Sequence, residues 1–267
     1  HAKNAYSSTP DQVKEWLVAA DLAQSMCGDV GTRYEPSEKE MNDLRQFRRG
    51  VFVKQDVQEG EIINRDNVFY AWPSQDDQVL ANDMSKYTHY LAHKTLKANE
   101  PVYNNNTTKV ESREKIWNIV QDVRSFLKDS GVVYPGEAKL EISHHYGIDK
   151  FYETGITMIT VVNREYCKKL IIALPGQNHP EQFHQQKEET FVVLHGSVEL
   201  RLNGKLSLLE KGSVVTIEPE VRHEFSTKTG CVIEEVSSTH YVNDSYYTDK
   251  EIAKNKNRKT FITHWID

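Results

Sequence analysis

Nine short runs rich in apolar residues follow one another through residues 138–240, and this pattern restricts the folds open to that part of the chain. Each run is five to eight residues long, and turn residues such as Gly, Asn or Pro separate it from the next. These lengths and spacings predict β-strands that pack as a sandwich or close into a jelly-roll barrel. The runs read KLEIS, GITMITVV, KKLIIAL, ETFVVLHG, SVELRL, KLSLLE, SVVTI, HEFST and CVIEEVSS. No internal repeat is apparent, which excludes a solenoid.

The first 45 residues predict a helix and a linker that precede a small β-module. Residues 8–25 predict a helix, because Pro10 suits a first turn and Val13 and Trp16 share one apolar face. The turn-rich and charged residues 27–45 predict a linker that contains a short helix. A helix with so narrow an apolar stripe needs a larger body to pack on.

The middle of the chain alternates short β-rich runs with turns. Residues 46–103 therefore predict a small all-β module, and the run NNNTT at 104–108 predicts a second linker. Helical spacing of apolar residues predicts a helix over about 109–129. The C-terminal residues 245–267 are expected to form a polar tail with aromatic anchors. We expect a mainly β protein of three segments, namely a terminal helix with a linker (1–45), a small β-module (46–105) and a β-barrel domain preceded by a helix (106–267).

Composition excludes several classes of protein. The net charge is −6 with basic and acidic residues interspersed, so no nucleic-acid partner is expected. No apolar run is long enough to span a membrane and no signal-peptide pattern is present, so a cytoplasmic location without membrane attachment is expected. Cys27, Cys167 and Cys231 are too few and too scattered for a disulfide framework.

Seven of the eleven histidines lie between residues 144 and 240, and two stretches give some of them a meaningful spacing. GQNHPEQFHQQKEETFVVLHG (176–196) contains His184 and, five residues later, Glu189. GSVVTIEPEVRHEF (212–225) contains His223 after a glycine and a proline. These stretches resemble the two motifs of the cupin family, in which histidines and a glutamate inside a β-barrel hold one divalent metal.

The cupin resemblance implies a metal site in this chain. It assigns His184, Glu189 and His223 as ligands, with Glu188 one register away from Glu189. Gln182 stands where the family has its first histidine, and a neutral amide is a poorer ligand than imidazole. The turn residue His179 is an alternative fourth ligand. Zinc, manganese or nickel would suit such a site, and the alternative is a metal-free cupin with a polar cavity.

A narrower resemblance concerns catalysis. FHQQKEETF together with IEEVSSTHYVND is similar to sugar-isomerase cupins of the D-lyxose isomerase type, which implies catalytic roles for Lys187 and Glu235. Moving a carbonyl between C1 and C2 of a sugar needs a base at C2 and an acid or metal at the oxygen. Side chains alternate along a strand, so only one of Glu234 and Glu235 faces the cavity, and we expect Glu235.

Substrate contacts are expected from a further set of residues. His144 and His145 lie on opposite faces, so at most one reaches the cavity; the expected substrate-binding residues are His144, Lys169, His240 and Trp72.

The N-terminal part has its own resemblance. SEKEMNDLRQFRRGVFVKQDVQEGEIINRDNVFYAWP and LAHKTLKANEPVY are similar to the C-terminal SAF, or antifreeze-like, domain of sialic acid synthases. YSSTPDQVKEWLVAADLAQSMCGD resembles the last helix of the barrel in those synthases. Trp72 stands where that family has a sugar-contacting arginine. The resemblance implies a homodimer in which this domain covers the partner's site.

We therefore interpret the chain as the C-terminal region of a sialic acid synthase-like protein of surface-sugar biosynthesis, fused to a metal-dependent sugar-isomerase cupin. Only the end of a synthase barrel falls within the sequence, so condensation of phosphoenolpyruvate by this chain is not expected. The alternative function is a non-catalytic sugar-binding cupin, with the SAF domain as a substrate lid and dimerisation module.

Overall fold

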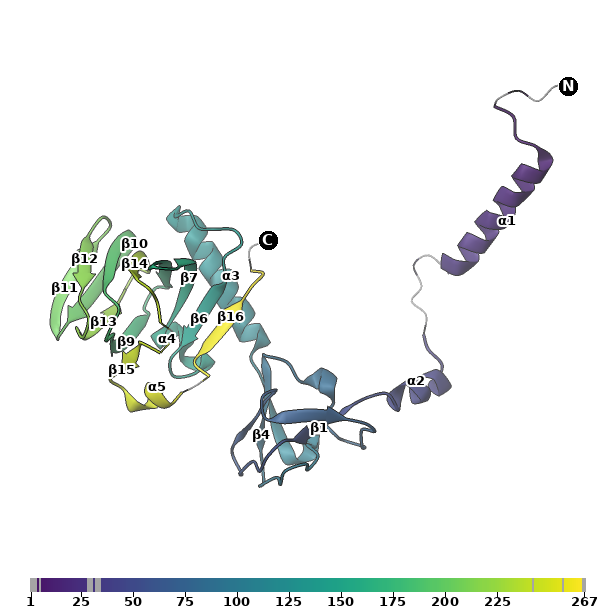
Figure 1. Cartoon of the computed structure of the whole chain (residues 1–267), viewed down its shortest axis with the longest axis horizontal. Coiled ribbons are helices and arrows are strands. Elements are labelled where there is room, and N and C mark those ends of the chain that lie inside the picture. The colour runs from purple at the N-terminus through teal and green to yellow at the C-terminus, as the bar shows by residue number, and fades with distance from the viewer. Residues whose placement is uncertain are drawn as a thin grey trace.

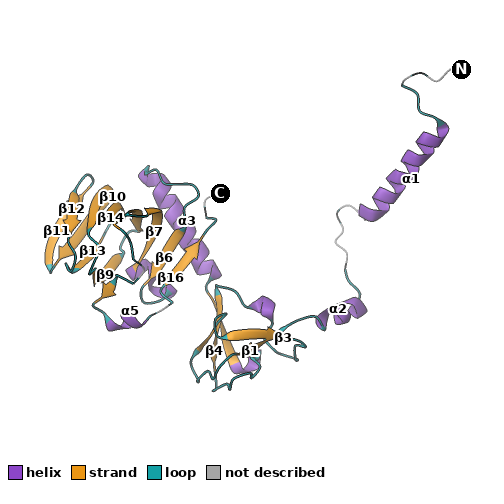
Figure 2. Ribbon diagram, in the orientation of Figure 1, coloured by secondary structure: helices purple, strands orange, loops and turns teal. Residues whose placement is uncertain are grey.

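The protein is mainly β, with few helices, and we describe it from a computed structural model. The structure describes residues 4, 6–27, 31, 35–241, 243–255 and 257–265. Figure 1 shows an N-terminal helical segment, a small β-module and a larger β-domain, and Figure 2 shows how strands dominate the last two. None of the described helices combines the length and the hydrophobicity that crossing a membrane requires.

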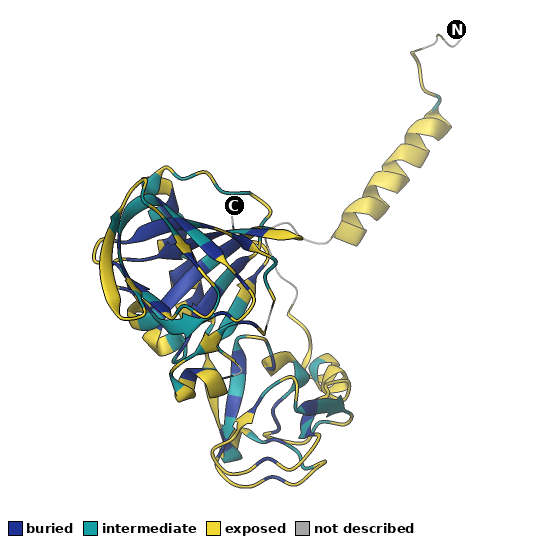
Figure 3. Ribbon diagram, turned by 60° about the vertical axis from the view of Figure 1, so that its left-hand side comes forward, coloured by how far each residue is buried: buried dark blue, intermediate teal, exposed yellow. Residues whose placement is uncertain are grey.

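The N-terminal segment contains the two expected helices, α1 (Pro10–Cys27) and α2 (Glu38–Arg45). The hydroxyl of Ser37 caps α2 by accepting a hydrogen bond from the backbone N–H of Glu40. Helix α1 has no buried residue, and Trp16 on its apolar stripe is 62% exposed. The apolar face of α1 is therefore not covered by any other described part of the chain. Figure 3 shows the helix in yellow, the colour of exposed residues.

The small β-module has two sheets around one apolar core. One sheet pairs β1 with β3, and the other has the order β2-β4-β5, all antiparallel. Eleven buried side chains between Val51 and Val102 form the core. The strands are β1 (Gly50–Val53), β2 (Ile62–Ile63), β3 (Val68–Ala71), β4 (Thr88–Ala92) and β5 (Thr107–Glu111), with 3-10 turns η1 (Ala81–Asp83) and η2 (Asn104–Asn106).

The expected linker at 104–108 is wrong. Residues 104–106 form η2, and Thr107 begins β5, which pairs with β4 as far as Glu111. The β-module thus continues six residues beyond the expected boundary at 105. The helix expected from about 109 starts later for the same reason, because β-pairing holds residues 107–111.

Helix α3 (Arg113–Ser130) joins the module to the larger domain. It ends at Gly131, whose φ of 66° suits the left-handed position that closes a helix. The helical spacing seen in the sequence is confirmed, since the apolar stripe is the buried face and packs on the larger sheet. The stripe consists of Ile116, Ile119, Val120, Val123 and Leu127.

The larger domain is built on an antiparallel sheet with the order β15-β9-β13-β10-β14-β8-β7-β6-β16, to which β11 and β12 are added by pairing with β10. Two apolar clusters lie on its opposite faces, one between the sheet and α3 and the other inside the curved sheet. The elements are β6 (Leu140–His144), η3 (Ile148–Lys150), α4 (Phe151–Thr154), β7 (Gly155–Asn163), β8 (Tyr166–Ala173), β9 (Asn178–Phe183), β10 (Glu189–Leu202), β11 (Lys205–Glu210), β12 (Val214–Ile217), β13 (His223–Ser226), β14 (Cys231–Ser238), β15 (Tyr246–Tyr247), α5 (Lys250–Lys254) and β16 (Lys259–Ile262).

Two runs that the sequence separates at Gly196 form one long strand, β10. The register shifts between Val193 and His195, and Gly196 has a φ of 74°. A β-bulge with a glycine in the left-handed region lets a strand bend without ending. Strand β10 therefore pairs with β12 and β14 before the bend and with β11 and β13 after it.

The C-terminal residues form part of the sheet rather than a loose tail. Strand β15 pairs with β9, and β16 pairs with β6 at the opposite end of the strand order. Ile252 on α5 and Trp265 are buried. The segment after β14 thus returns across the domain and closes one side of its interior.

Candidate active site

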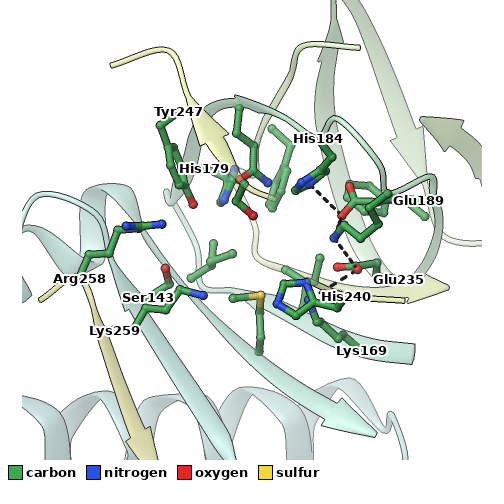
Figure 4. A pocket seen from close by; sticks show the side chains of 18 residues that line it. Ser143, Lys169, His179, His184, Glu189, Glu235, His240, Tyr247, Arg258 and Lys259 are labelled. Atoms are coloured by element: carbon green, nitrogen blue, oxygen red, sulfur yellow. Dashed lines mark hydrogen bonds and ion pairs between the residues drawn. The ribbon is translucent and has the colours of Figure 1, made fainter. Parts of the chain in front are cut away.

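A pocket opens inside the curved sheet of the larger domain, and most of its polar side chains converge on it from separate strands (Figure 4). Strands β6 to β10, β13 and β14 form its walls, and the segment after β14 closes it. The lining consists of Ser143, Ile156, Met158, Lys169, Ile171, His179, Gln182, His184, Lys187, Glu189, Phe191, Phe225, Glu235, His240, Ser245, Tyr247, Arg258 and Lys259.

The loop between β9 and β10 supplies His184 and Lys187 and is held by a buried aspartate. The carboxylate of Asp244 accepts hydrogen bonds from the backbone N–H groups of Gln185, Gln186 and Lys187. Its backbone carbonyl accepts a hydrogen bond from Nδ1 of His184 at 2.5 Å. A carbonyl only accepts, so Nδ1 of His184 carries the proton and Nε2 presents a lone pair to the pocket.

His184, Glu189 and His223 form a buried cluster whose ligand atoms all lie within 4.8 Å of one another. Nε2 of His184 is 3.2 Å from one oxygen of Glu189, and Nε2 of His223 is 3.5 Å from the other. Nδ1 of His223 donates to the carbonyl of Val221, so its Nε2 also presents a lone pair. Glu188 is exposed, and Glu189 is the carboxylate that lies in the pocket.

This cluster fits a divalent cation. Nε2 of His184 and one oxygen of Glu189 are buried without a hydrogen-bond partner. The two Nε2 atoms carry lone pairs and face the carboxylate oxygens, so all of these atoms are acceptors. A cation between them stabilises such a set. Two imidazoles and a carboxylate are a donor set that zinc and related transition metals take.

Gln182 lies beside the cluster, and His179 does not belong to it. The amide nitrogen of Gln182 is 3.3 Å from Nε2 of His223, and its amide oxygen is buried without a partner. His179 stacks on Phe225 with a centroid separation of 4.9 Å and makes an edge contact with His145. Burial lowers the pKa of His179 well below its usual value, with His145 adding to the effect.

Lys187 bridges the metal-type cluster and a second carboxylate. Its ammonium contacts Glu189 and donates to Oε1 of Glu235 at 3.0 Å. Burial lowers the pKa of Lys187, but the charges of Glu189 and Glu235 outweigh this and raise it above its ordinary value. Conversely, burial acts to raise the pKa of Glu189, and the charge of Lys187 holds it well below its usual range. Lys187 is therefore charged at neutral pH.

Glu235 lies on the pocket face of β14, and its neighbour Glu234 points outward. Lys169, directly opposite Glu235 on β8, is 3.7 Å from Oε1, and the hydroxyl of Ser237 donates to the same atom. Glu234 forms an ion pair with Lys168 on the other face of the sheet. Among the described residues these contacts all involve Oε1 of Glu235, and none involves Oε2.

The expected substrate-binding residues divide into two pairs. Lys169 and His240 line the pocket. His144 instead faces away from it, and its Nε2 lies 3.1 Å from the hydroxyl of Thr260. Trp72 lies in the small β-module, 64% exposed, where its Nε1 donates to the carbonyl of Phe47. In this chain His144 and Trp72 are not part of the pocket.

Several pocket residues were missed by sequence reasoning. Tyr247, Arg258 and Lys259 come from the segment that was expected to be a polar tail, and Ser143 precedes the histidine pair. Asp244, which anchors the loop after β9, was also missed. The one available signal was the residue types of KTFI, since Thr, Phe and Ile are enriched in strands.

Comparison with known protein families identifies the fold of part of the larger domain. Residues 170–233 match the cupin domain model. The chain therefore contains a cupin domain, which covers β8 to the middle of β14 and includes the metal-type cluster.

Particular relatives are sugar isomerases. A D-lyxose/D-mannose isomerase of Thermosediminibacter oceani is 26% identical over 172 residues, which is 53% of this chain and 95% of the relative. The L-ribose isomerase of Geodermatophilus obscurus is 15% identical, with a TM-score of 0.47 over 55% of this chain and 96% of that structure. The C-terminal part of the chain is thus similar in sequence to this D-lyxose/D-mannose isomerase.

A third similarity involves a longer protein. The structure of a putative spore coat polysaccharide biosynthesis protein E from Chromobacterium violaceum is 41% identical over 40% of this chain, with a TM-score of 0.30. The match spans about a third of that protein, 32% of its length.

Proposed function

We propose that the cupin domain is a metal-dependent aldose–ketose isomerase acting on a sugar. One observation carries this proposal. Glu235, His184 and Glu189 line the same pocket, His223 contacts Glu189, and the ammonium of Lys187 connects Glu189 with Glu235. A base beside a cation-binding cluster is the arrangement that proton transfer next to a carbonyl requires.

The metal would be held by Nε2 of His184, Nε2 of His223 and the carboxylate of Glu189, with Gln182 beside them. When bound, a divalent cation supplies polarisation of the carbonyl and hydroxyl oxygens at C1 and C2 of an open-chain sugar. His179 is not among these ligands, because it lies outside the cluster of His184, Glu189 and His223.

Glu235 is proposed as the base that removes the C2 proton. As the C2–H bond breaks, a double bond forms between C1 and C2 and the C1 carbonyl oxygen gains a proton. Reprotonation at C1 and loss of the proton on the C2 hydroxyl then give the ketose. Lys187, a charged donor 3.0 Å from Glu235, is proposed to supply and recover the protons at oxygen.

The test is hydrogen exchange at C2. Purified protein loaded with zinc, manganese or nickel is incubated in deuterated water with pentoses, hexoses and N-acylhexosamines, each with and without a phosphate or carboxylate group. Proton NMR then follows loss of the C2 signal, which appears even without net conversion. Exchange that needs both metal and protein supports the isomerase. If no sugar exchanges with metal bound, the cupin is better described as a sugar-binding domain.

We also propose that residues 6–103 correspond to the end of a sialic acid synthase-like protein, with the β-module acting as an SAF domain. The motifs quoted above support this, and the module has its own apolar core. Sedimentation of the purified chain tests the associated homodimer, which would be lost when residues 1–111 are removed if the module mediates it.

A further inference from the structure

The pocket has a cationic end that the proposed isomerisation does not use. Arg258 and Lys259, at the start of β16, line the pocket on the side away from His184 and Glu189, and Figure 4 shows their nitrogen atoms directed toward the cavity. The hydroxyls of Ser143 and Tyr247 lie on the same side. A neutral pentose or hexose offers no charge to such a group.

Within the described part of the chain, Arg258 differs from the other pocket cations in lacking an acidic partner. Lys187 is paired with Glu189 and Glu235, Lys169 with Glu235, and Lys259 with Glu141 at 2.7 Å. No described carboxylate forms an ion pair with Arg258. One of its terminal nitrogens donates to the carbonyl of Asn255, and its Nε is buried without any partner.

The guanidinium lies over the ring of Tyr247, whose position is fixed by a hydrogen bond. Its central carbon lies 5.1 Å from the centroid of the Tyr247 ring. The hydroxyl of Tyr247 is 3.0 Å from Nε2 of His145, whose Nδ1 donates to the carbonyl of Thr154. His145 Nε2 is therefore an acceptor, and the hydroxyl of Tyr247 donates to it. A planar guanidinium fixed in this way is suited to paired hydrogen bonds with a carboxylate or a phosphate.

The formal charges of the side chains that line the pocket also favour an anion. Four basic side chains line it against two carboxylates, and Glu141 pairs with Lys259, so the charge of Arg258 is left uncompensated in a chain whose net charge is −6. The positive field also acts on nearby histidines. Burial, with Lys169, Lys187 and Lys259, lowers the pKa of His240 to about 3. Burial, with a further contribution from Arg258, lowers the pKa of His145 to about 4.

We infer that the sugar substrate is anionic, and that Arg258, assisted by Lys259, binds its phosphate or carboxylate group at the end of the pocket away from His184, Glu189 and His223. This inference rests on the proposed function, because it places the reacting carbonyl at that cluster. The anion gives the sugar a second point of attachment and so fixes which end is presented to Glu235. Phosphate and carboxylate share the chemistry that Arg258 recognises.

The first experiment measures specificity. C2 exchange is compared between a neutral hexose, its 6-phosphate and the corresponding uronate, using wild-type protein, Arg258→Gln and the control Arg65→Gln. Arg65 is exposed in the small β-module and loses the same charge far from the pocket. We expect kcat/KM to be highest for one anionic sugar, and to fall about 10- to 100-fold for it in Arg258→Gln but not in Arg65→Gln. Activity on the neutral hexose should be unchanged in Arg65→Gln.

Arg258→Lys is a second variant that guards against a folding defect, because it keeps the positive charge and loses only the paired hydrogen bonds of the guanidinium. We expect its kcat/KM for the anionic sugar to lie between those of wild-type protein and Arg258→Gln. The two anionic sugars show which anion Arg258 binds. A higher kcat/KM for the 6-phosphate indicates a phosphate group, and a higher value for the uronate indicates a carboxylate. A wild-type preference for the neutral hexose, or equal losses in the Arg258 and Arg65 variants, would overturn the anionic substrate while the isomerase stands.

The second experiment is independent of catalysis. Calorimetry measures binding of the same hexose 6-phosphate and uronate to wild-type protein, Arg258→Gln and His223→Ala. Anion binding that survives His223→Ala and weakens about 10- to 100-fold in Arg258→Gln supports the site even if no sugar exchanges at C2. Binding that is lost in His223→Ala and retained in Arg258→Gln would show that the anion binds only at the metal cluster, and would contradict the inference.

Discussion

The backbone carbonyl of Asp244 accepts a hydrogen bond from Nδ1 of His184 at 2.5 Å, while the side chain of the same aspartate accepts hydrogen bonds from three backbone N–H groups of the loop that follows His184. One buried residue thus fixes both the tautomer of a candidate ligand and the loop that carries it. Because 60 residues separate the two, the relationship arises only in the folded domain.

Removing the Asp244 carboxylate should weaken metal binding. In Asp244→Ala the loop from 185 to 187 loses three acceptor contacts, and we expect the metal dissociation constant to rise about 10- to 100-fold. Competition with a chelator measures it. The control is Asp129→Ala, since Asp129 is exposed on α3. Equal affinities in the two variants would contradict a positioning role for Asp244.

The metal site itself predicts a stoichiometry. Protein purified without chelator should contain about one equivalent of zinc, manganese or nickel by elemental analysis, because three buried donors converge on one point. His223→Ala should lose it, and His93→Ala, at an exposed histidine of the small β-module, should retain it. A wild-type protein that neither contains nor takes up metal would refute the site.

The two adjacent glutamates of β14 give a matched test of catalysis. Glu235→Gln should lower the rate of C2 exchange by about 10² to 10⁴, the usual contribution of a general base, without changing metal content. Glu234→Gln removes the same charge from the outer face and should leave the rate within about a factor of two. Comparable rates for the two variants would exclude Glu235 as the base.

Lys187→Met is expected to reduce exchange less than Glu235→Gln if water replaces the ammonium. Lys168→Met, which breaks the ion pair with Glu234 on the outer face, is its control. Rates of C2 exchange, measured by stopped flow or NMR at saturating metal, are compared for Lys187→Met, Glu235→Gln and Lys168→Met.

The buried histidine His145 predicts how stability depends on pH. Burial lowers its pKa to about 4 in the folded protein, whereas an unfolded histidine titrates near 6.5. The unfolded state therefore binds the additional proton between these values, so the free energy of unfolding is largest above about pH 6.5 and falls as the pH drops toward 4. Each group contributes a slope of about 1.4 kcal/mol per pH unit.

Urea unfolding of metal-free protein at several pH values measures this slope. His145→Gln should reduce it by about one proton between about pH 6 and pH 5, although the variant is less stable overall. His93→Gln, at an exposed site, should keep the wild-type slope. An unaltered slope in His145→Gln would mean that His145 does not contribute to acid sensitivity.

The bend in β10 depends on Gly196. Its φ is 74°, and a Cβ there would lie 2.0 Å from the carbonyl oxygen of Gly230. We expect Gly196→Ala to lower the free energy of unfolding by roughly 2 to 5 kcal/mol, which combines the left-handed backbone with overpacking. Gly204→Ala shares a positive φ of 82° but meets no atom within 4 Å, so it should cost only about 1 to 2 kcal/mol. Equal losses in denaturant melts would show that the close contact with Gly230 is unimportant.

Sequence alone determined those parts of the protein that depend on local periodicity. The alternation of side chains along CVIEEVSS is sufficient to separate Glu235 from Glu234, and helical spacing identified the buried face of α3. The resemblance to the cupin motifs also implied His184, Glu189 and His223 as a set, and these residues lie close together in the structure. The limits of local pattern appear at 104–108, where polar residues typical of a linker form the 3-10 turn η2 and the start of β5.

Tertiary structure decided the other wall of the site. Tyr247, Arg258 and Lys259 reach the pocket because β15 and β16 pair with β9 and β6, strands that lie far away in sequence. Edge pairing of this kind is stabilised by backbone hydrogen bonds, which leave almost no mark on residue type. The sequence therefore supplied the residues of the metal-type cluster, and the return of the chain across the sheet supplied the cation that we infer selects its substrate.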